Sequence, residues 1–91
     1  MGELWIVQLF HTIHARKQMA NRGMTLGDVE EAICLGKAKQ ARWQNHPEYG
    51  WRIVATGQNY YENKLTAILV PYEEHSREDA YKIVTAFWTD T

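Results

Sequence analysis

The predicted fold begins with residues 12–23, which have the sequence TIHARKQMANRG. This stretch predicts a short helix from about Ile13 to Arg22, because residues that favour a helix start and a helix stop bound it. The hydroxyl of Thr12 can cap the first backbone N–H groups, and Gly23 can adopt the left-handed conformation that ends many helices. The apolar stripe is modest, so most of the helix surface is polar and includes a histidine and several cations.

A second helix is predicted directly after the first, from about Leu26 to Leu35. Thr25 precedes it and Asp28 follows three residues later, which is the spacing of a capping box with Asp in place of the usual Glu or Gln. The apolar residues of this segment fall on one helical face, which predicts burial of that face. Gly36 is the expected stop signal. The chain is therefore expected to open with two helices in succession.

After residue 36 the pattern changes from helical to extended. Four segments rich in strand-forming residues are separated by turns at 44–50 and 58–63 and by a polar loop at 72–79. The expected strands are 37–43, 51–57, 65–70 and 81–88. Residues 4–10 are apolar and form either a further strand or a lead-in to the first helix. We expect a single α+β domain over residues 1–91, in which two N-terminal helices pack on an antiparallel sheet of about four strands.

Charge is distributed unevenly along the chain, although the formal net charge is only −1. Residues 11–52 are net positive and residues 53–91 are net negative. Such asymmetry is compatible with a basic surface patch on an otherwise balanced domain. A non-specific nucleic-acid binder usually carries an overall basic excess, which this chain lacks. The charge balance alone therefore leaves both a nucleic-acid interface and an ordinary solvated surface open.

Cys34 is the only cysteine, so an internal disulfide is excluded. It lies in an apolar helical pattern, which predicts a buried, reduced thiol and a cytoplasmic protein. The apolar segment 4–10 is too short to cross a membrane and lacks a basic leader. The histidines are dispersed without the spacing of metal ligands, so no metal is expected. Neither a Gly-rich phosphate loop nor another cofactor motif is present, and no cofactor is expected.

The order of several short motifs resembles a family of small bacterial domains of unknown function. The family pattern is a Thr-x-His-Ala, a Met, a Glu-Arg-Gly-Ile, a Ser or Thr cap and an Asp-Val or Asp-Ile, followed by an Ile-x-Thr-x-Tyr/Phe strand. The matching residues here are His14-Ala15-Arg16, Met19, Asn21-Arg22-Gly23-Met24-Thr25, Asp28-Val29, Gly36 and Ile83-Val84-Thr85-Ala86-Phe87-Trp88. The resemblance covers about residues 11–90.

That family is similar in architecture to the RelE/ParE and BrnT toxins and to a broader group of metal-independent ribonucleases. The resemblance implies a RelE/BrnT-like α+β fold, cleavage of mRNA or tRNA, and an antitoxin partner. Fold alone does not determine function. Several relatives of RelE do not cleave RNA, and ParE-like members act on gyrase instead.

RNA cleavage without a metal requires a base for the 2′-hydroxyl proton, an acid for the leaving 5′-oxygen, and cations that stabilise the attacked phosphate. His suits the first two roles because its unperturbed pKa is about 6.5, and Arg binds two phosphate oxygens with its planar fork. His14, where the family motif matches, is the candidate acid or base. Arg52, at the start of a predicted strand, is the candidate catalytic cation on an open sheet face. The candidate phosphate or RNA contacts are Arg16, Lys17, Arg22, Thr85 and Trp88.

Each candidate also has an ordinary structural interpretation. His14 can cap its helix or pack beside the sheet, and Arg22 can stabilise the C-terminus of that helix. Thr85 is a β-branched residue of the kind that strands favour. Three aromatic residues can stack on bases, or they can lie in the core or face a protein partner; these are Trp88, Tyr72 and Trp51.

Two functional hypotheses follow. In the first, the chain is a ribonuclease toxin-like protein that cleaves RNA and pairs with an antitoxin. In the second, it is a non-catalytic interaction module or a homodimer that uses Trp and Tyr side chains as anchors. The first helix and the family resemblance favour ribonuclease activity, and the near-neutral charge favours an interaction module. The first hypothesis expects His14 and Arg52 to face one open concave surface.

Overall fold

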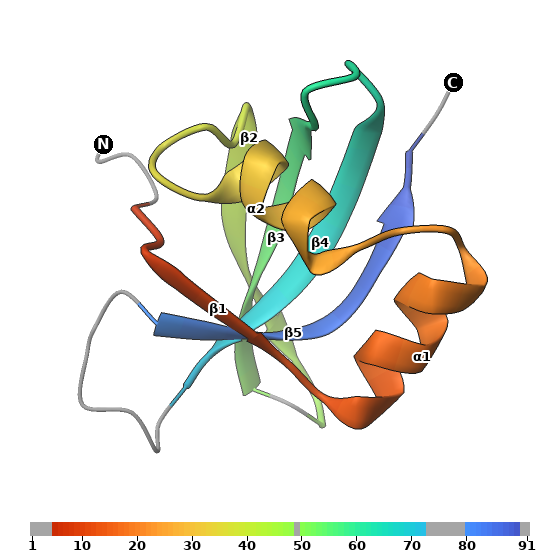
Figure 1. Cartoon of the computed structure of the whole chain (residues 1–91). Coiled ribbons are helices and arrows are strands. Elements are labelled where there is room, and N and C mark those ends of the chain that lie inside the picture. Colours follow the sequence, from red (N-terminus) through yellow and green to blue (C-terminus); the bar gives the residue numbers. More distant parts are fainter. Residues whose placement is uncertain (1–4, 49, 73–79, 90–91) are drawn as a thin grey trace.

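The computed structural model describes residues 5–48, 50–72 and 80–89. The elements in chain order are β1 (Gln8–His11), α1 (Ile13–Asn21), α2 (Leu26–Ile33), β2 (Gln40–His46), β3 (Gly50–Gln58), β4 (Lys64–Pro71) and β5 (Ala80–Trp88). All strands belong to one twisted sheet, with α2 in front of one face and α1 beside β5 (Figure 1). Apart from Tyr72, the predicted loop at 72–79 lies outside the described residues.

The sheet differs from the expected one in the number and direction of its strands. The described residues form five strands in the order β1-β5-β4-β3-β2. Strand β1 runs parallel to β5, whereas the other neighbouring pairs are antiparallel. The prediction of a helix-first domain on an antiparallel sheet of about four strands was therefore wrong, although the α+β class is correct. The additional strand comes from the apolar segment before the first helix, which extends the sheet beside the last strand of the chain.

Both helices begin at the threonines predicted to cap them. The Thr12 hydroxyl accepts a hydrogen bond from the backbone N–H of Ala15 at 2.9 Å. Thr25 and Asp28 form a complete capping box, because each backbone N–H donates to the side chain of the other residue, at 2.9 and 3.1 Å. These bonds satisfy donors that the first turn of a helix leaves unpaired.

The helices end where the backbone becomes left-handed. Gly23 follows α1 with a φ of 67°. Helix α2 ends at Ile33, two residues before the predicted end, because Leu35 and Gly36 have φ values of 57° and 74°. The backbone N–H of Leu35 donates instead to the carbonyl of Ile6 at 2.9 Å. This bond ties the end of α2 to the segment that leads into β1.

The core lies between the helices and one face of the sheet. The buried positions of β3 alternate along the strand, at Ile53, Ala55 and Gly57, and their partners on the same face of β4 are Leu69, Ala67 and Leu65. Thr66, on the opposite face of β4, is also buried. Gly57 lies so close to α2 that an added Cβ would be 2.0 Å from the carbonyl oxygen of Ala32. Met19 of α1 and Cys34 belong to the same buried cluster. The predicted burial of Cys34 is therefore confirmed.

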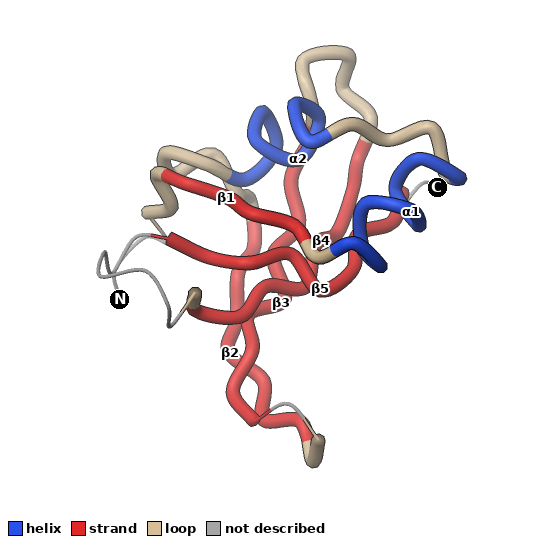
Figure 2. The backbone as a smooth tube through the Cα atoms, turned by 60° about the horizontal axis from the view of Figure 1, so that its bottom comes forward, coloured by secondary structure: helices blue, strands red, loops and turns tan. Residues whose placement is uncertain are grey.

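The opposite face of the sheet is not covered by a helix in the described part of the chain. Side chains alternate between the faces of a strand, and cross-strand partners share a face. We call this side the open face; its side chains belong to Gln40, Arg42, Gln44, Arg52, Val54, Thr56, Gln58, Lys64, Thr66, Ile68, Val70, Lys82, Thr85 and Phe87. Figure 2 shows that the β2–β3 end of the sheet extends away from both helices.

The strand boundaries shift from the predicted ones where pairing overrides composition. Strand β2 covers Gln40–His46 rather than 37–43, because residues that read as a turn pair with the start of β3. The other three predicted strands are present with ends that differ by at most one residue. None of the described helices is long and apolar enough to span a membrane.

Candidate nucleic-acid interface

Every cation of the sheet lies on the open face. The five described strands contain Arg42, Arg52, Lys64 and Lys82 and no Asp or Glu. The described acidic residues lie on α2 or in turns, at Asp28, Glu30, Glu31, Glu48 and Glu62. Because these cations gather on one face and no carboxylate of the described strands lies between them, the face favours the binding of anions.

Arg52 is positioned across the sheet by Gln44 of β2. The Nε and Nη2 groups of Arg52 both donate to Gln44 Oε1, at 3.0 and 2.6 Å. Gln44 is neutral, and no carboxylate of the described residues pairs with the guanidinium. A guanidinium has five N–H donors, so its remaining donors can bind phosphate oxygens. Arg52 is therefore an oriented cation whose charge is not neutralised by its partner.

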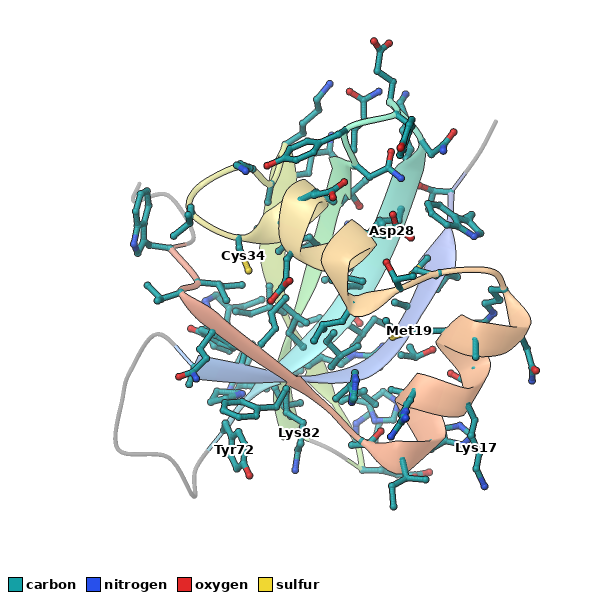
Figure 3. The ribbon with its side chains drawn as sticks, in the orientation of Figure 1. Lys17, Met19, Asp28, Cys34, Tyr72 and Lys82 are labelled. Carbon is teal, nitrogen blue, oxygen red and sulfur yellow. The ribbon has the colours of Figure 1, made fainter. Side chains whose placement is uncertain are left out.

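Lys82 of β5 lies beside aromatic side chains on the open face. It pairs with Val70 in β4 and Phe10 in β1. Its Nζ lies 5.6 Å from the ring centroid of Tyr72, and the rings of Tyr72 and Phe10 meet edge to face at 4.5 Å. Figure 3 shows Lys82 and Tyr72 close together on one side of the sheet. A cation next to aromatic rings matches the combination that single-stranded nucleic-acid binders use for phosphates and bases.

His14 is linked to the rim of the open face by two polar side chains. Thr85 lies in β5 opposite Ile68, next to a shift in the strand register. The Thr85 hydroxyl donates to Gln18 Oε1 at 2.7 Å, and Gln18 Nε2 lies 2.9 Å from His14 Nε2. His14 itself is exposed. These hydrogen bonds form a continuous chain from the sheet to the surface of α1.

This chain couples the tautomer of His14 to the orientation of the Gln18 amide. Because Gln18 Oε1 accepts from Thr85, the amide nitrogen donates to His14 Nε2 and the ring proton lies on Nδ1. If the amide reverses, Thr85 accepts from the amide nitrogen, His14 Nε2–H donates to the amide oxygen, and Nδ1 carries a lone pair. In both arrangements Nδ1 is the ring nitrogen that is not occupied by Gln18.

Arg22 and Trp88 stabilise the edge of β5 that β1 does not reach. Strand β1 pairs only with the first part of β5, at 80–83. Beyond it, Arg22 Nη1 donates to the Ala86 carbonyl at 2.6 Å, and Trp88 Nε1 donates to the Arg22 carbonyl at 2.7 Å. Such contacts protect a sheet edge. Both residues therefore have a structural role, and their contact with RNA stays a prediction.

Arg16 and Lys17 project from the outer side of α1 and are exposed. Successive residues of a helix are rotated by about 100°, so Arg16 points away from the side of His14, whereas Lys17 is about 60° from it. Figure 3 shows the Lys17 side chain directed outward from α1. The structure therefore places Lys17 and His14 on adjoining helix surfaces and does not bring Arg16 to the open face.

Several residues that complete this surface were not predicted from the sequence. Gln18 was detectable, because residues four apart on a helix lie on the same side as each other. Arg42, Gln44 and Lys82 had no local signal, since only the strand register places them beside Arg52. Within residues 5–48, 50–72 and 80–89, no group of three or more His, Cys, Asp or Glu could hold a metal ion.

Residues 12–88 match the model of a protein family, described as a domain of unknown function, DUF4258. The chain therefore belongs to this family. No curated protein and no solved structure matches it. The predicted membership of a family of domains of unknown function is confirmed, and the similarity to the RelE and BrnT toxins stays a prediction.

Proposed function

We propose that this domain is a toxin-like, metal-independent ribonuclease whose open face binds RNA phosphates. The observation that carries the proposal is the charge pattern of the sheet, in which Arg42, Arg52, Lys64 and Lys82 share one face and none of the described strands contains a carboxylate. Phosphate neutralisation by such cations provides most of the affinity in non-specific nucleic-acid binding. The near-neutral total charge is compatible with this role, because the described acidic residues lie on other elements.

The open face offers an RNA strand a path toward His14. Arg42, Val54, Ile68 and Thr85 form one row across β2 to β5, which spans about 14 Å at the usual strand spacing. His14 is connected to the end of this row through Thr85. A strand held at the β2 end of the row by Arg42 therefore runs toward the exposed imidazole.

In the proposed reaction His14 acts through Nδ1. With the Gln18 amide reversed, Nε2–H donates to the amide and Nδ1 accepts the proton of the 2′-hydroxyl as that oxygen attacks the adjacent phosphorus. The imidazolium then returns this proton to the leaving 5′-oxygen, which produces a 2′,3′-cyclic phosphate. Arg52 is proposed to hold a phosphate further along the strand, because Gln44 holds its guanidinium toward β2, across the sheet from Thr85. Gln18 and Thr85 are positioning residues, and Arg16, Lys17, Arg22 and Trp88 are proposed to contact RNA outside the reacting bond.

The test is cleavage of an end-labelled single-stranded RNA in the presence of EDTA. We expect the protein to generate 2′,3′-cyclic phosphate ends, and His14→Ala to lower the rate by about 100-fold or more, the range of general acid–base catalysis. Arg52→Ala should lower the rate and weaken the salt dependence of RNA binding. Gln18→Ala should change the pH profile of the rate, because it no longer selects the tautomer of His14.

The matched control is Lys37→Ala, which removes a charge beside Tyr60 rather than on the open face. This variant should cleave RNA like the unmodified protein. Equal rates for His14→Ala and the unmodified protein would exclude His14 as the proton-transfer group. Absence of cleavage by the unmodified protein on any RNA would contradict the proposed activity.

The toxin role and the antitoxin partner are tested by expression in a bacterium. Expression of the unmodified chain should arrest growth, whereas His14→Ala should not, and co-expression of the protein encoded by the neighbouring gene should relieve the arrest. Identical growth arrest by the unmodified chain and by His14→Ala would exclude His14 as the catalytic residue. Normal growth in both would favour the alternative of a non-catalytic interaction module.

A further inference from the structure

The two edges of the sheet differ in how they are covered. At one edge β1 has only four residues, and Arg22, which directly follows α1, donates a hydrogen bond to the part of β5 beyond it. At the other edge β2 has seven residues and pairs with β3 without a register shift. No other described strand or helix lies beside β2 (Figure 2). Such an edge presents alternate backbone N–H and C=O groups that can pair with a further strand.

The β2 edge also lacks the features that usually prevent strand pairing. Natural edge strands are commonly short, charged, bulged or interrupted by proline. Strand β2 has a single formal charge, at Arg42, and no proline. Trp43, at its centre, is 52% exposed, and Trp51, its diagonal neighbour on β3, is 60% exposed. Large exposed aromatic side chains at an open edge are typical anchors of protein interfaces.

We infer that β2 pairs in an antiparallel manner with β2 of a second copy of this chain, centred on Trp43. A two-fold axis perpendicular to the sheet joins the two strands, so that residues on the same face become partners. Centring on Trp43 pairs every residue of β2, with Gln40 opposite His46 and Arg42 opposite Gln44. This register also places the two Trp43 side chains opposite each other, and aromatic cross-strand pairs are stabilising.

The neighbouring registers that preserve the faces are less favourable. Centring on Arg42 places two like charges directly opposite each other, which destabilises a strand pair, and leaves the two residues at one end of β2 unpaired. Centring on Gln44 also leaves two residues unpaired and separates the Trp43 side chains. The chemistry of β2 is therefore self-complementary in one register, and this favours a second copy as the occupant of the edge.

The dimer is a continuous sheet built from two five-stranded sheets. The open faces of the two copies lie on the same side, because the two-fold axis is perpendicular to the sheet. Arg42 of each copy lies close to the axis, so the cations of both copies form one extended surface. This dimer does not depend on the proposed ribonuclease activity, and it is measured without RNA.

Disulfide formation tests the register. In the centred dimer the Cα atoms of the two residues at position 43 are about 4.5–5.5 Å apart, which is within the range of a disulfide. Trp43→Cys should form a covalent dimer on mild oxidation, whereas Ala41→Cys should not, because position 41 lies opposite Asn45 of the other copy. A mixture of Ala41→Cys and Asn45→Cys should form the heterodimer. Cys34 is buried and is shared by all variants.

The oligomeric state of the unmodified protein provides the second readout. Sedimentation should detect a dimer, and Trp43→Lys should be monomeric with an unchanged circular dichroism spectrum, because the side chain is already half exposed. A monomeric unmodified protein at high concentration would overturn the inference. So would equal crosslinking of Ala41→Cys and Trp43→Cys, or a Trp43→Lys variant that remains dimeric.

Discussion

The packing of α2 against β3 leads to a strong prediction for Gly57→Ala. Gly57 is not in a left-handed conformation, so an added Cβ causes no backbone strain of that kind. The new Cβ would instead lie 2.0 Å from the Ala32 carbonyl oxygen and 2.8 Å from its carbon. Both are backbone atoms of a helix. The clash cannot be relieved by rotation of a side chain, and α2 must move away from the sheet.

The size of the effect follows from the required displacement. Ordinary contact of a Cβ begins near 3.4 Å, so the helix and strand must separate by more than 1 Å. That separation opens the core around Ile33 and Val29, which are fully buried. Overpacking of a core usually costs about 1–3 kcal/mol, and we expect at least the upper end. At about 4–8 °C per kcal/mol for a small domain, the melting temperature should fall by at least about 12 °C.

The assay is thermal and urea denaturation followed by circular dichroism, with Gly27→Ala as the matched control. Gly27 lies in α2, and its added Cβ would be 3.5 Å from the Thr25 hydroxyl, an ordinary contact. Because Ala favours a helix over Gly by up to about 1 kcal/mol, this control should be neutral or stabilising. A Gly57→Ala protein within about 0.5 kcal/mol of the unmodified protein would refute the described packing of α2.

Two further predictions concern Cys34 and Trp88. Burial, with a smaller contribution from Glu30 and an opposing one from Lys37, raises the pKa of Cys34 from 9.0 to about 11. Between these two pKa values the unfolded state binds fewer protons than the native state, so the free energy of unfolding should fall as the pH rises. The Cys34→Ala variant should lack the contribution of this thiol to the decrease, as measured by denaturation at a series of pH values. Trp88→Phe removes the 2.7 Å bond to the Arg22 carbonyl and should cost about 1 kcal/mol in urea denaturation. If the free energy of unfolding falls no more than for an exposed surface substitution, the hydrogen bond between Trp88 and Arg22 does not contribute to stability.

Local chemistry was sufficient to predict the helices and most of the strands. The hydroxyls of Thr12 and Thr25 cap the helices as expected, because capping depends on residues only three positions apart. The pairing of β1 with β5 was missed, because it joins segments about 70 residues apart and its parallel direction has no local signal. The early end of α2 was missed as well. Leucine rarely adopts the left-handed conformation that Leu35 has, and the hydrogen bond from its backbone N–H to the Ile6 carbonyl has no local signal in the sequence.

The candidate site was predictable only in part. Residue types and the family motif singled out His14 and Arg52, because their chemistry suits phosphate cleavage. The partners that orient them, Gln18 and Gln44, are neutral amides that composition does not distinguish from other polar surface residues. The gathering of cations on one face depends on the register of four strands, which the sequence pattern alone does not determine.

The central claim is that the open face binds RNA phosphates. The most direct measurement is a titration of the ¹⁵N-labelled protein with a single-stranded RNA blocked at its 2′-hydroxyls, followed through the side-chain Nε–H resonances of arginine and the backbone amides. We predict that the Nε–H signals of Arg42 and Arg52 and the amides near Lys82 and Thr85 shift most, and that added salt reverses the shifts. Shifts confined to the outer surface of α2, or no shifts at all, would contradict the account.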